Sequence, residues 1–196
     1  MTPILKKTLV IFDFDGTIYK GDSFMDFALM ACGRWKMLCA LALSVHHILA
    51  WKLGYITNGE AKQRLFGKLY KGMTYNQFKQ FGETFADQID RKYNTQVVGQ
   101  LDTVCENTII ATASIGDWII PWARRHGVKE VIATEVEIYN GRLTGNFSSP
   151  NCFGIEKVRR ILQKIPDAEN FHIVVYTDSE TSDAPIIELA DECIIV

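Results

Sequence analysis

The sequence predicts an α/β fold: a parallel sheet with helices on both faces and a helical subdomain inserted after the first strand. Three observations predict this fold class. Short apolar runs with many β-branched residues, typical of buried strands, recur along the chain. In the second half these runs alternate with helical patterns, as in strand–helix–strand units. In the first half a long, mostly helical stretch follows the first run.

The first predicted strand comprises residues 8–12, and the elements that follow it are helices. Asp22 or Ser23 is suited to cap the first helix. From there to Cys105 the pattern stays helical, and glycine and asparagine residues divide it into about four helices. We therefore expect a core made of residues 1–20 and 106–196, and a helical insertion made of residues 21–105.

The second half alternates between strands and helices. Asn140-Gly141 lies between the strand-like segments 136–139 and 142–144, and this dipeptide favours the tight turn of a hairpin. Gly127 is suited to end one helix and Pro166 another. The predicted strands are residues 108–112, 128–133, 171–176 and 193–196, and the predicted helices are residues 117–126, 155–165 and 184–190.

The composition excludes some classes of function. The chain has 196 residues and a formal net charge of -2, and it has no long basic run, so nothing favours binding to nucleic acid. Its five cysteines are odd in number and form no C-x-x-C pair, which argues against a disulfide framework or a zinc site. Free thiols, and the lack of an apolar signal core in residues 1–7, predict a cytoplasmic protein.

Residues 37–51 are almost wholly apolar and lie between Lys36 and Lys52. The run is shorter than the roughly 18–20 residues that a membrane-spanning helix requires, so we expect a buried or amphipathic helix. A helix that lies on a membrane surface, at the inner face of the membrane, is the alternative. The aromatic residues of the insertion are expected to form its core rather than a substrate-binding cage. These are Trp35, Trp51, Phe78, Phe81 and Phe85.

Polar residues directly follow the predicted strands, and the carboxyl ends of parallel strands share one edge of a sheet. We therefore expect these side chains, with a lysine that begins a later helix, to form one site. Four carboxylates would repel one another there, and a hard divalent cation such as Mg²⁺ would relieve that repulsion. The residues are Asp13, Asp15, Gly16, Thr17, Thr112, Ser114, Lys157, Asp178, Ser179 and Asp183.

This set of residues suits phosphoryl transfer. At an ordinary pKa of about 3.9, Asp13 is ionised and able to attack phosphorus, which forms an aspartyl-phosphate. Asp15 is placed to protonate the leaving oxygen and then to activate water. Gly16 allows a tight turn that brings amide groups to the phosphate. Lys157 supplies fixed positive charge and Thr112 a hydroxyl donor.

In four places, and in the same order, the chain resembles the haloacid dehalogenase superfamily of phosphohydrolases. The matching segments are residues 13–17 (Asp-Phe-Asp-Gly-Thr), 109–114 (Ile-Ile-Ala-Thr-Ala-Ser), 152–157 (Cys-Phe-Gly-Ile-Glu-Lys) and 176–183 (Tyr-Thr-Asp-Ser-Glu-Thr-Ser-Asp). The resemblance implies a three-layer, Rossmann-like α/β core, a helical cap between the first two motifs, dependence on Mg²⁺, and nucleophilic attack by Asp13.

The resemblance also implies a role for each site residue. Asp13 and Asp178 would bind Mg²⁺ through their side chains and Asp15 through its carbonyl, and Asp183 would be a less well-defined member of the metal site. The phosphate would be held by Thr112 (with Ser114 as the alternative hydroxyl), Lys157, Gly16 and Ala113.

The segments 140–145 and 151–154 resemble the phosphoserine-phosphatase-like branch, but two features differ. Asp178 and Asp183 are one residue further apart than is common in that branch, which leaves the role of Asp183 open. Asp22-Ser23-Phe24 replaces the acidic pair with which phosphoserine phosphatases bind the substrate amine. This replacement argues against phosphoserine as the substrate.

We therefore expect a Mg²⁺-dependent phosphomonoester hydrolase that acts on a small phosphorylated metabolite. One alternative is a lipid-phosphate phosphatase at the membrane surface, because the apolar run 37–51 is similar to that of lipid-phosphate members such as phosphatidylglycerophosphatase. Transfer of the phosphoryl group to an acceptor other than water is a further alternative. A non-catalytic scaffold is the weakest, since all the required residue types are present.

Overall fold

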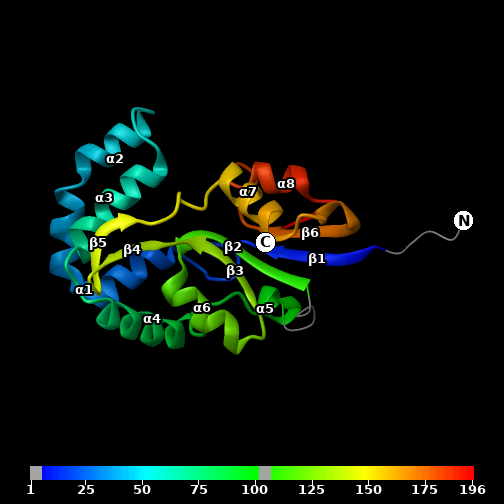
Figure 1. Ribbon diagram of the computed structural model, residues 1–196, viewed down its shortest axis with the longest axis horizontal. Coiled ribbons are helices and arrows are strands. Elements are labelled where there is room, and N and C mark those ends of the chain that lie inside the picture. The colour runs from blue at the N-terminus through cyan, green and yellow to red at the C-terminus, as the bar shows by residue number, and fades with distance from the viewer. Residues whose placement is uncertain (1–5, 102–106) are drawn as a thin grey trace, which may run out of the picture.

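The computed structural model describes residues 6–101 and 107–196. Its centre is a five-stranded sheet with the strand order β3-β2-β1-β6-β7, and every neighbouring pair is parallel (Figure 1). The central strand β1 therefore lies between β2 and β6, and the strand order reverses at this place. The strands are β1 Lys7–Phe12, β2 Thr108–Ile115, β3 Glu130–Thr134, β6 Phe171–Thr177 and β7 Glu192–Ile195.

Helices cover both faces of this sheet, which confirms the predicted fold class (Figure 1). Alternate residues of β1 enter two different hydrophobic clusters, as the two-residue period of a strand requires. Leu9 and Ile11 pack on the side of α7 and α8, whereas Val10 and Phe12 pack on the side of α5 and α6. The helices are α5 Thr95–Leu101, α6 Gly116–Arg125, α7 Ile155–Lys164 and α8 Ala184–Leu189. A 3₁₀ turn, η2 Ala168–Asn170, precedes β6.

The insertion between β1 and β2 is helical, with five described helices instead of the four expected from the sequence. Thr57 and Thr74 each form a capping box with the side chain three residues later, which explains where α3 and α4 begin. The expected boundary between residues 105 and 106 lies outside the described residues. Besides α5, the helices are α1 Ser23–Ala42, α2 Val45–Lys52, α3 Asn58–Tyr70 and α4 Tyr75–Ile89.

The predicted hairpin is confirmed as β4 Val136–Tyr139 and β5 Arg142–Phe147, which pair antiparallel. Asn140 and Gly141 have φ values of 48° and 73°, the left-handed conformation that their tight turn requires. The hairpin extends from the sheet to the insertion, where β5 packs against α3 (Figure 1). Gly67 and Gly145 make this close packing possible, because a Cβ on Gly67 would lie 3.1 Å from the Gly145 carbonyl oxygen.

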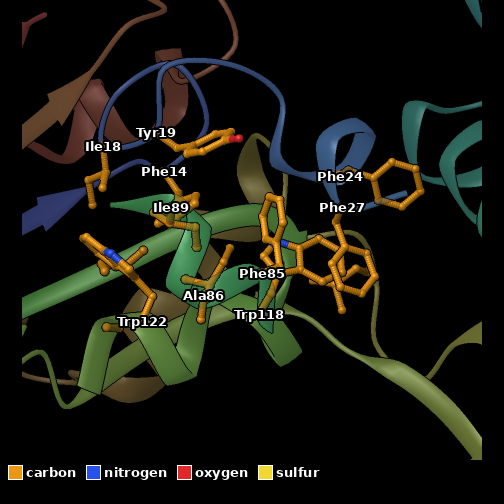
Figure 2. Packing of buried hydrophobic residues seen from close by; sticks show 14 of the residues in the cluster. Phe14, Ile18, Tyr19, Phe24, Phe27, Phe85, Ala86, Ile89, Trp118 and Trp122 are labelled. Carbon is orange, nitrogen blue, oxygen red and sulfur yellow. The ribbon is translucent and has the colours of Figure 1, made fainter. Parts of the chain in front are cut away.

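One continuous hydrophobic cluster joins the insertion to the core (Figure 2). Phe27 of α1 stacks on Trp118 of α6 with ring centroids 4.2 Å apart, and Phe78 and Phe85 of α4 surround the same pair. The expectation that Phe78 and Phe85 are core residues is confirmed, and Phe81 is partly buried beside them.

The same expectation is wrong for Trp35 and Trp51. Their exposed fractions are 81 % and 39 %, because they lie on helices that turn away from the core. None of the eight residues of α2 is buried, so a fully buried helix over residues 37–51 is excluded. Ala40 is buried and Met37 and Leu41 pack against the core, which agrees with the amphipathic form of the expectation for the α1 part of this run. Within the described part of the chain, no single helix is long and apolar enough to cross a membrane. Only α1 and α2 together meet that test, and they are bent by 59° relative to each other.

Candidate active site

The loop after β1 turns sharply at Gly16. Gly16 has a φ of 83°, which favours glycine, and a Cβ there would lie only 2.0 Å from Oδ2 of Asp178. The backbone N–H of Asp13 donates to the carbonyl oxygen of Tyr176 at 2.9 Å, which ties the loop to the end of β6. The glycine therefore allows the Asp178 carboxylate to lie against the backbone of the loop that carries Asp13 and Asp15.

Asp13, Lys157 and Asp183 form a buried charged cluster. The ammonium of Lys157 donates to Asp13 Oδ1 and to Asp183 Oδ1, both at 2.6 Å. Burial lowers the pKa of Lys157, but the two carboxylates outweigh it and hold that pKa above its ordinary value. Lys157 therefore stays protonated. Of the three protons of its ammonium group, two are donated to carboxylates and one can serve a ligand.

The ordinary pKa expected for Asp13 is wrong. Burial raises the pKa of this carboxyl group, and the Asp183 carboxylate adds to the rise, whereas Lys157 opposes it. Asp13 Oδ2 also accepts a long hydrogen bond of 3.4 Å from the Thr17 hydroxyl. The charge state of Asp13 is thus set by its neighbours, with Lys157 as the group that favours the carboxylate.

Asp15 lies in a separate hydrogen-bond network. Its Oδ1 accepts from the backbone N–H of Ser23 at 2.8 Å, and its Oδ2 accepts from the hydroxyl of Ser114. The hydrogen-bond network extends to α1 and α6. The Ser23 hydroxyl donates to Ser114 Oγ at 3.0 Å and accepts from the indole N–H of Trp118 at 3.2 Å. Burial raises the pKa of Asp15, which favours the protonated form that a general acid needs.

Thr112 and Ser114 were expected to follow the second strand, but β2 extends to Ile115 and contains both, and the structure separates the roles of their hydroxyls. Ser114 already donates to Asp15, so its hydrogen is not available to a phosphate. Thr112 is buried, and its Oγ1 accepts from the backbone N–H of Ser114 at 3.0 Å. Its own hydroxyl hydrogen has no acceptor among the hydrogen bonds of the described residues. This favours Thr112 over Ser114 as the phosphate donor.

Sequence reasoning missed Lys62, a lysine that reaches the site from α3. Its ammonium group donates to the carbonyl oxygen of Ala113 at 2.9 Å and lies 5.0 Å from the centre of the Phe24 ring. Burial lowers the pKa of Lys62, and the negative charge of Asp15 is the strongest influence that opposes this. A signal was available, because Lys62 is three and four residues before the buried Leu65 and Phe66, on the inward face of the helix.

The sequence model of the haloacid dehalogenase-like hydrolases matches residues 10–188. The chain belongs to this family. It is therefore a hydrolase, and the family predicted from the four motifs is confirmed.

Several known proteins are similar to this chain in sequence or in fold over most of its length. The protein CicA of Caulobacter vibrioides is 29 % identical over 194 residues, which cover 94 % of this chain and 83 % of CicA. A solved structure of a Bordetella pertussis protein of unknown function has a TM-score of 0.81 at 24 % identity, covering 97 % of this chain and 90 % of that one. A phospho-aspartyl intermediate analogue of phosphoserine phosphatase has a TM-score of 0.61 at 15 % identity, covering 96 % and 93 %. These structural likenesses confirm the fold.

The Mg²⁺ that this family implies has suitable ligands in this chain. Asp13 and Asp178 offer hard carboxylate oxygens, and the position of Asp178 against Gly16 brings the two donor segments together. No group of three or more His, Cys, Asp or Glu residues in residues 6–101 and 107–196 is arranged as a metal site. Mg²⁺ often uses only one or two protein carboxylates and keeps several waters, so this donor set fits Mg²⁺ better than a cation that needs a full protein cage.

Asp183, the fourth predicted acid, is oriented by protein groups on both sides. Its Oδ1 accepts from Lys157 and its Oδ2 accepts from the Thr177 hydroxyl, each at 2.6 Å. The carboxylate is almost fully buried, whereas that of Asp178 is exposed. The contacts of Asp183 favour a role in positioning Lys157 over a role as a metal ligand.

A cleft of about 680 Å³ lies next to the site, at the junction of the insertion and the core. It is lined by the N-terminal turn of α3 and by the loop before α7, including Asn58, Gln63 and Asn151. Asn151 Nδ2 donates to Asn58 Oδ1 at 3.3 Å and so links these two walls. Trp51, Phe147 and Phe153 give the cleft an apolar side. Of the predicted site residues none lines it directly, so we interpret it as a space beside the phosphate site.

Proposed function

We propose that the chain is a Mg²⁺-dependent phosphomonoester hydrolase that forms an aspartyl-phosphate on Asp13. The arrangement of two neighbouring carboxyl groups in different environments supports this most strongly. Asp13 is ion-paired with Lys157, which favours the carboxylate of a nucleophile. Burial raises the pKa of both carboxyl groups, so the difference lies in their partners. Asp15, two residues later, accepts from the Ser23 backbone and the Ser114 hydroxyl and not from an ammonium group, which suits an acid.

The reaction has two steps. A carboxylate oxygen of Asp13 forms a bond to phosphorus while the bond from phosphorus to the ester oxygen breaks, and Asp15 gives its proton to that leaving oxygen. In the second step the Asp15 carboxylate takes a proton from water, whose oxygen attacks phosphorus. The bond to Asp13 then breaks and inorganic phosphate leaves. Water is consumed, and both aspartates return to their starting states.

The phosphate is held by residues from the loop after β1, from the second half of β2 and from the first turn of α7. Lys157 has one further ammonium proton to donate, and the Thr112 hydroxyl, whose hydrogen has no acceptor within residues 6–101 and 107–196, can donate as well. Gly16 and Ala113 bring backbone close to the same place, and the Ala113 carbonyl is fixed by Lys62 and Thr134, each at 2.9 Å. Bound Mg²⁺, held by Asp13, Asp178 and the Asp15 carbonyl, would neutralise charge on the phosphoryl oxygens.

A small phosphorylated metabolite is the substrate class that we propose, and phosphoserine is not favoured. Asp22, which stands in the region where an amine-binding acid would lie, caps α1 by accepting from the N–H of Met25 at 3.0 Å. Phe24 is buried and lies below the Lys62 ammonium. These contacts leave no acidic pair for a substrate amine at these two positions.

A second substrate class is the phosphate ester of a membrane lipid. The apolar side of the cleft, with Trp51, Phe147 and Phe153, supports it, because such side chains can hold acyl or glycerol groups next to a phosphate site. Measuring the rate of phosphate release distinguishes the two classes. The substrates to compare are a soluble aryl phosphate, a panel of phosphorylated metabolites, and a lipid phosphate in vesicles. Assaying free phosphate together with phosphorylated acceptors in the same samples distinguishes hydrolysis from transfer.

The Asp13→Asn variant tests the nucleophile. We expect phosphate release from an aryl phosphate with Mg²⁺ to fall by about 10⁴-fold or more, since an amide cannot form the intermediate. Circular dichroism should be unchanged, because Lys157 keeps Asp183 as a partner. Asp167→Asn is the matched control, since Asp167 is exposed and its side chain caps nothing. Turnover of Asp13→Asn at the level of this control would rule out Asp13 as the nucleophile.

A further inference from the structure

Strongly exposed apolar side chains gather in one segment of the insertion, residues 35–55, which comprises the second half of α1, helix α2 and the turn after it. Trp35, Leu53 and Tyr55 are exposed to 81 %, 71 % and 80 %, values unusual for such side chains. We call this surface the apolar cap face. Its members are Trp35, Leu38, Leu43, Val45, Leu49, Trp51, Leu53 and Tyr55. Exposed apolar surface of this extent marks a place of interaction more often than a random feature of the surface.

The backbone produces this face through a break in α1. Gly33 has a φ of 76° and a ψ of 163°, so the helix does not continue straight through it. The first half of α1 is anchored in the core by Phe24, Phe27 and Ala28, whereas the second half and α2 extend along the edge of the insertion (Figure 1). Helix α2 packs against α3 and buries none of its own residues. The chain therefore presents this segment to the outside.

The charges on this segment differ from those of the whole chain. Between Phe27 and Gly59 there is no Asp or Glu, whereas Arg34, Lys36 and Lys52 provide positive charge, and the chain has a net charge of -2. We propose that the apolar cap face docks onto the surface of an anionic lipid bilayer. Anionic headgroups complement this combination of apolar and basic side chains. A second copy of the chain would instead bring the same positive charges against it.

The geometry fits a segment that lies in the bilayer interface. Trp35, Trp51 and Tyr55 are of the residue types that concentrate at the boundary between headgroups and acyl chains. The first half of α1 is enclosed by protein, so α1 cannot be surrounded by lipid along its length. The second helix is bent away from it by 59°, which lets both apolar portions rest on one surface.

Docking would also bring the cleft to the lipid surface. Trp51 belongs both to the apolar cap face and to the wall of the cleft, and Phe153, on the opposite wall, is 40 % exposed. A phosphate ester in the membrane could then reach the site without leaving the interface. The docking proposal is independent of the proposed reaction, because none of the residues of the apolar cap face belongs to the catalytic site.

The test is flotation of the full chain with vesicles of phosphatidylcholine, with and without phosphatidylglycerol. We expect the wild type to float with the phosphatidylglycerol vesicles. The triple variant Leu38→Gln, Leu43→Gln, Leu53→Gln should bind at least about tenfold more weakly, since it removes apolar area from the contact. The control variant Tyr139→Gln, Leu162→Gln, Ile195→Gln changes exposed apolar residues elsewhere and should float like the wild type.

Further variants separate docking from catalysis and charge from apolar contact. Aryl phosphate turnover of the first triple variant should equal that of the wild type, which shows that the fold is intact. Asp13→Asn should float normally although it is inactive. A second triple variant tests the role of charge. It carries Arg34→Gln, Lys36→Gln and Lys52→Gln, and it should lose the preference for vesicles with phosphatidylglycerol.

Three results would overturn the proposal. The first is that the wild type does not float with anionic vesicles. The second is that the Leu-to-Gln triple variant floats as well as the wild type. The third is that the wild type forms a dimer in lipid-free buffer and the triple variant does not. The last result would identify a second copy of the chain as the occupant of the face.

Discussion

Lys157 forms ion pairs with two buried carboxylates of the site, Asp13 and Asp183. Lys157 contacts Asp13 and Asp183 at the same distance, 2.6 Å, but the two carboxylates have different surroundings. Asp183 has both oxygens engaged by protein donors, whereas the side chain of Asp13, as far as the described residues show, accepts besides the lysine only the long hydrogen bond from Thr17. Asp183 can therefore hold Lys157 in place while Asp13 changes its bonding during the reaction.

This difference predicts distinct behaviour for Asp183→Asn and Asp178→Asn. Removing the carboxylate charge at Asp183 weakens the hold on Lys157, so we expect kcat/KM to fall about 10- to 100-fold at saturating Mg²⁺. The Mg²⁺ concentration for half-maximal activity should stay at the wild-type value. In Asp178→Asn that concentration should rise, because a metal ligand is lost. Titrating Mg²⁺ in both variants measures this, and a raised Mg²⁺ requirement in Asp183→Asn would make Asp183 a metal ligand after all.

At the residue scale the sequence identified site residues that lie near the carboxyl ends of predicted strands and at the start of a predicted helix. Asp13, Asp15, Thr112 and Lys157 could be predicted because strand ends and helix starts are visible in a local pattern. For Lys62 the helical spacing indicates only that the side chain lies on the inward face of α3, and neither its contact with Ala113 nor the role of Ser23 could be predicted, since both depend on how the insertion folds back over the sheet. Ser23 is 91 residues from Ser114, and only the tertiary structure brings their hydroxyls together.

At the scale of elements, the turn after β1 depends on a glycine for two separate reasons. Its positive φ disfavours any other residue, and its missing Cβ gives the space that Asp178 occupies. Gly72, in the turn between α3 and α4, has nearly the same φ of 85° but has nothing within 4 Å of a Cβ position. A substitution at either glycine is therefore strained by the positive φ, but only a substitution at Gly16 brings a Cβ against Asp178.

We predict that Gly16→Ala and Gly72→Ala lose similar stability but differ in activity. Each should lower the free energy of unfolding by about 1–2 kcal/mol, because alanine is strained at positive φ. Only Gly16→Ala should need more Mg²⁺ and turn over more slowly, since its Cβ displaces Asp178. Urea unfolding and Mg²⁺ titration measure the two effects. A Gly16→Ala protein that matches Gly72→Ala in Mg²⁺ requirement would show that the Asp178 position is unimportant.

The order of the elements was predictable, whereas the packing of the insertion was not. Strand and hairpin positions follow from apolar runs and from Asn140-Gly141, which are local signals. The sequence predicted a buried or amphipathic helix for the apolar run 37–51, because hydrophobicity alone does not show which side chains are covered. In the structure Ala40 and Ser44 are buried, whereas Leu38, Leu43 and Leu49 are exposed. The break at Gly33 decides that outcome, and a lone glycine in a helical pattern signals it only weakly.

At the scale of the whole molecule, the insertion and the sheet share one hydrophobic core. Phe27 on α1 and Trp118 on α6 stack at 4.2 Å, and Trp118 also donates to Ser23, next to the site (Figure 2). Helix α4 also packs along α6. The same contacts that stabilise the molecule therefore orient the Ser23–Ser114–Asp15 network, and we expect stability and activity to depend on each other.

A shared core predicts that the insertion and the sheet unfold together. Fluorescence of Trp118 and Trp122 in a Trp35→Phe, Trp51→Phe background reports on the core, and far-ultraviolet circular dichroism reports on all helices. The two urea transitions should coincide. Phe27→Ala should lower the free energy of unfolding by about 3–5 kcal/mol and keep them coincident, because the lost contacts belong to both parts. Leu29→Ala, on the same helix but 42 % exposed, should change it by only about 0.5 kcal/mol. Consider the protein that carries only the Trp35→Phe and Trp51→Phe changes. If its circular dichroism signal were lost at a lower urea concentration than its tryptophan fluorescence, the insertion would be an independent unit attached to the sheet.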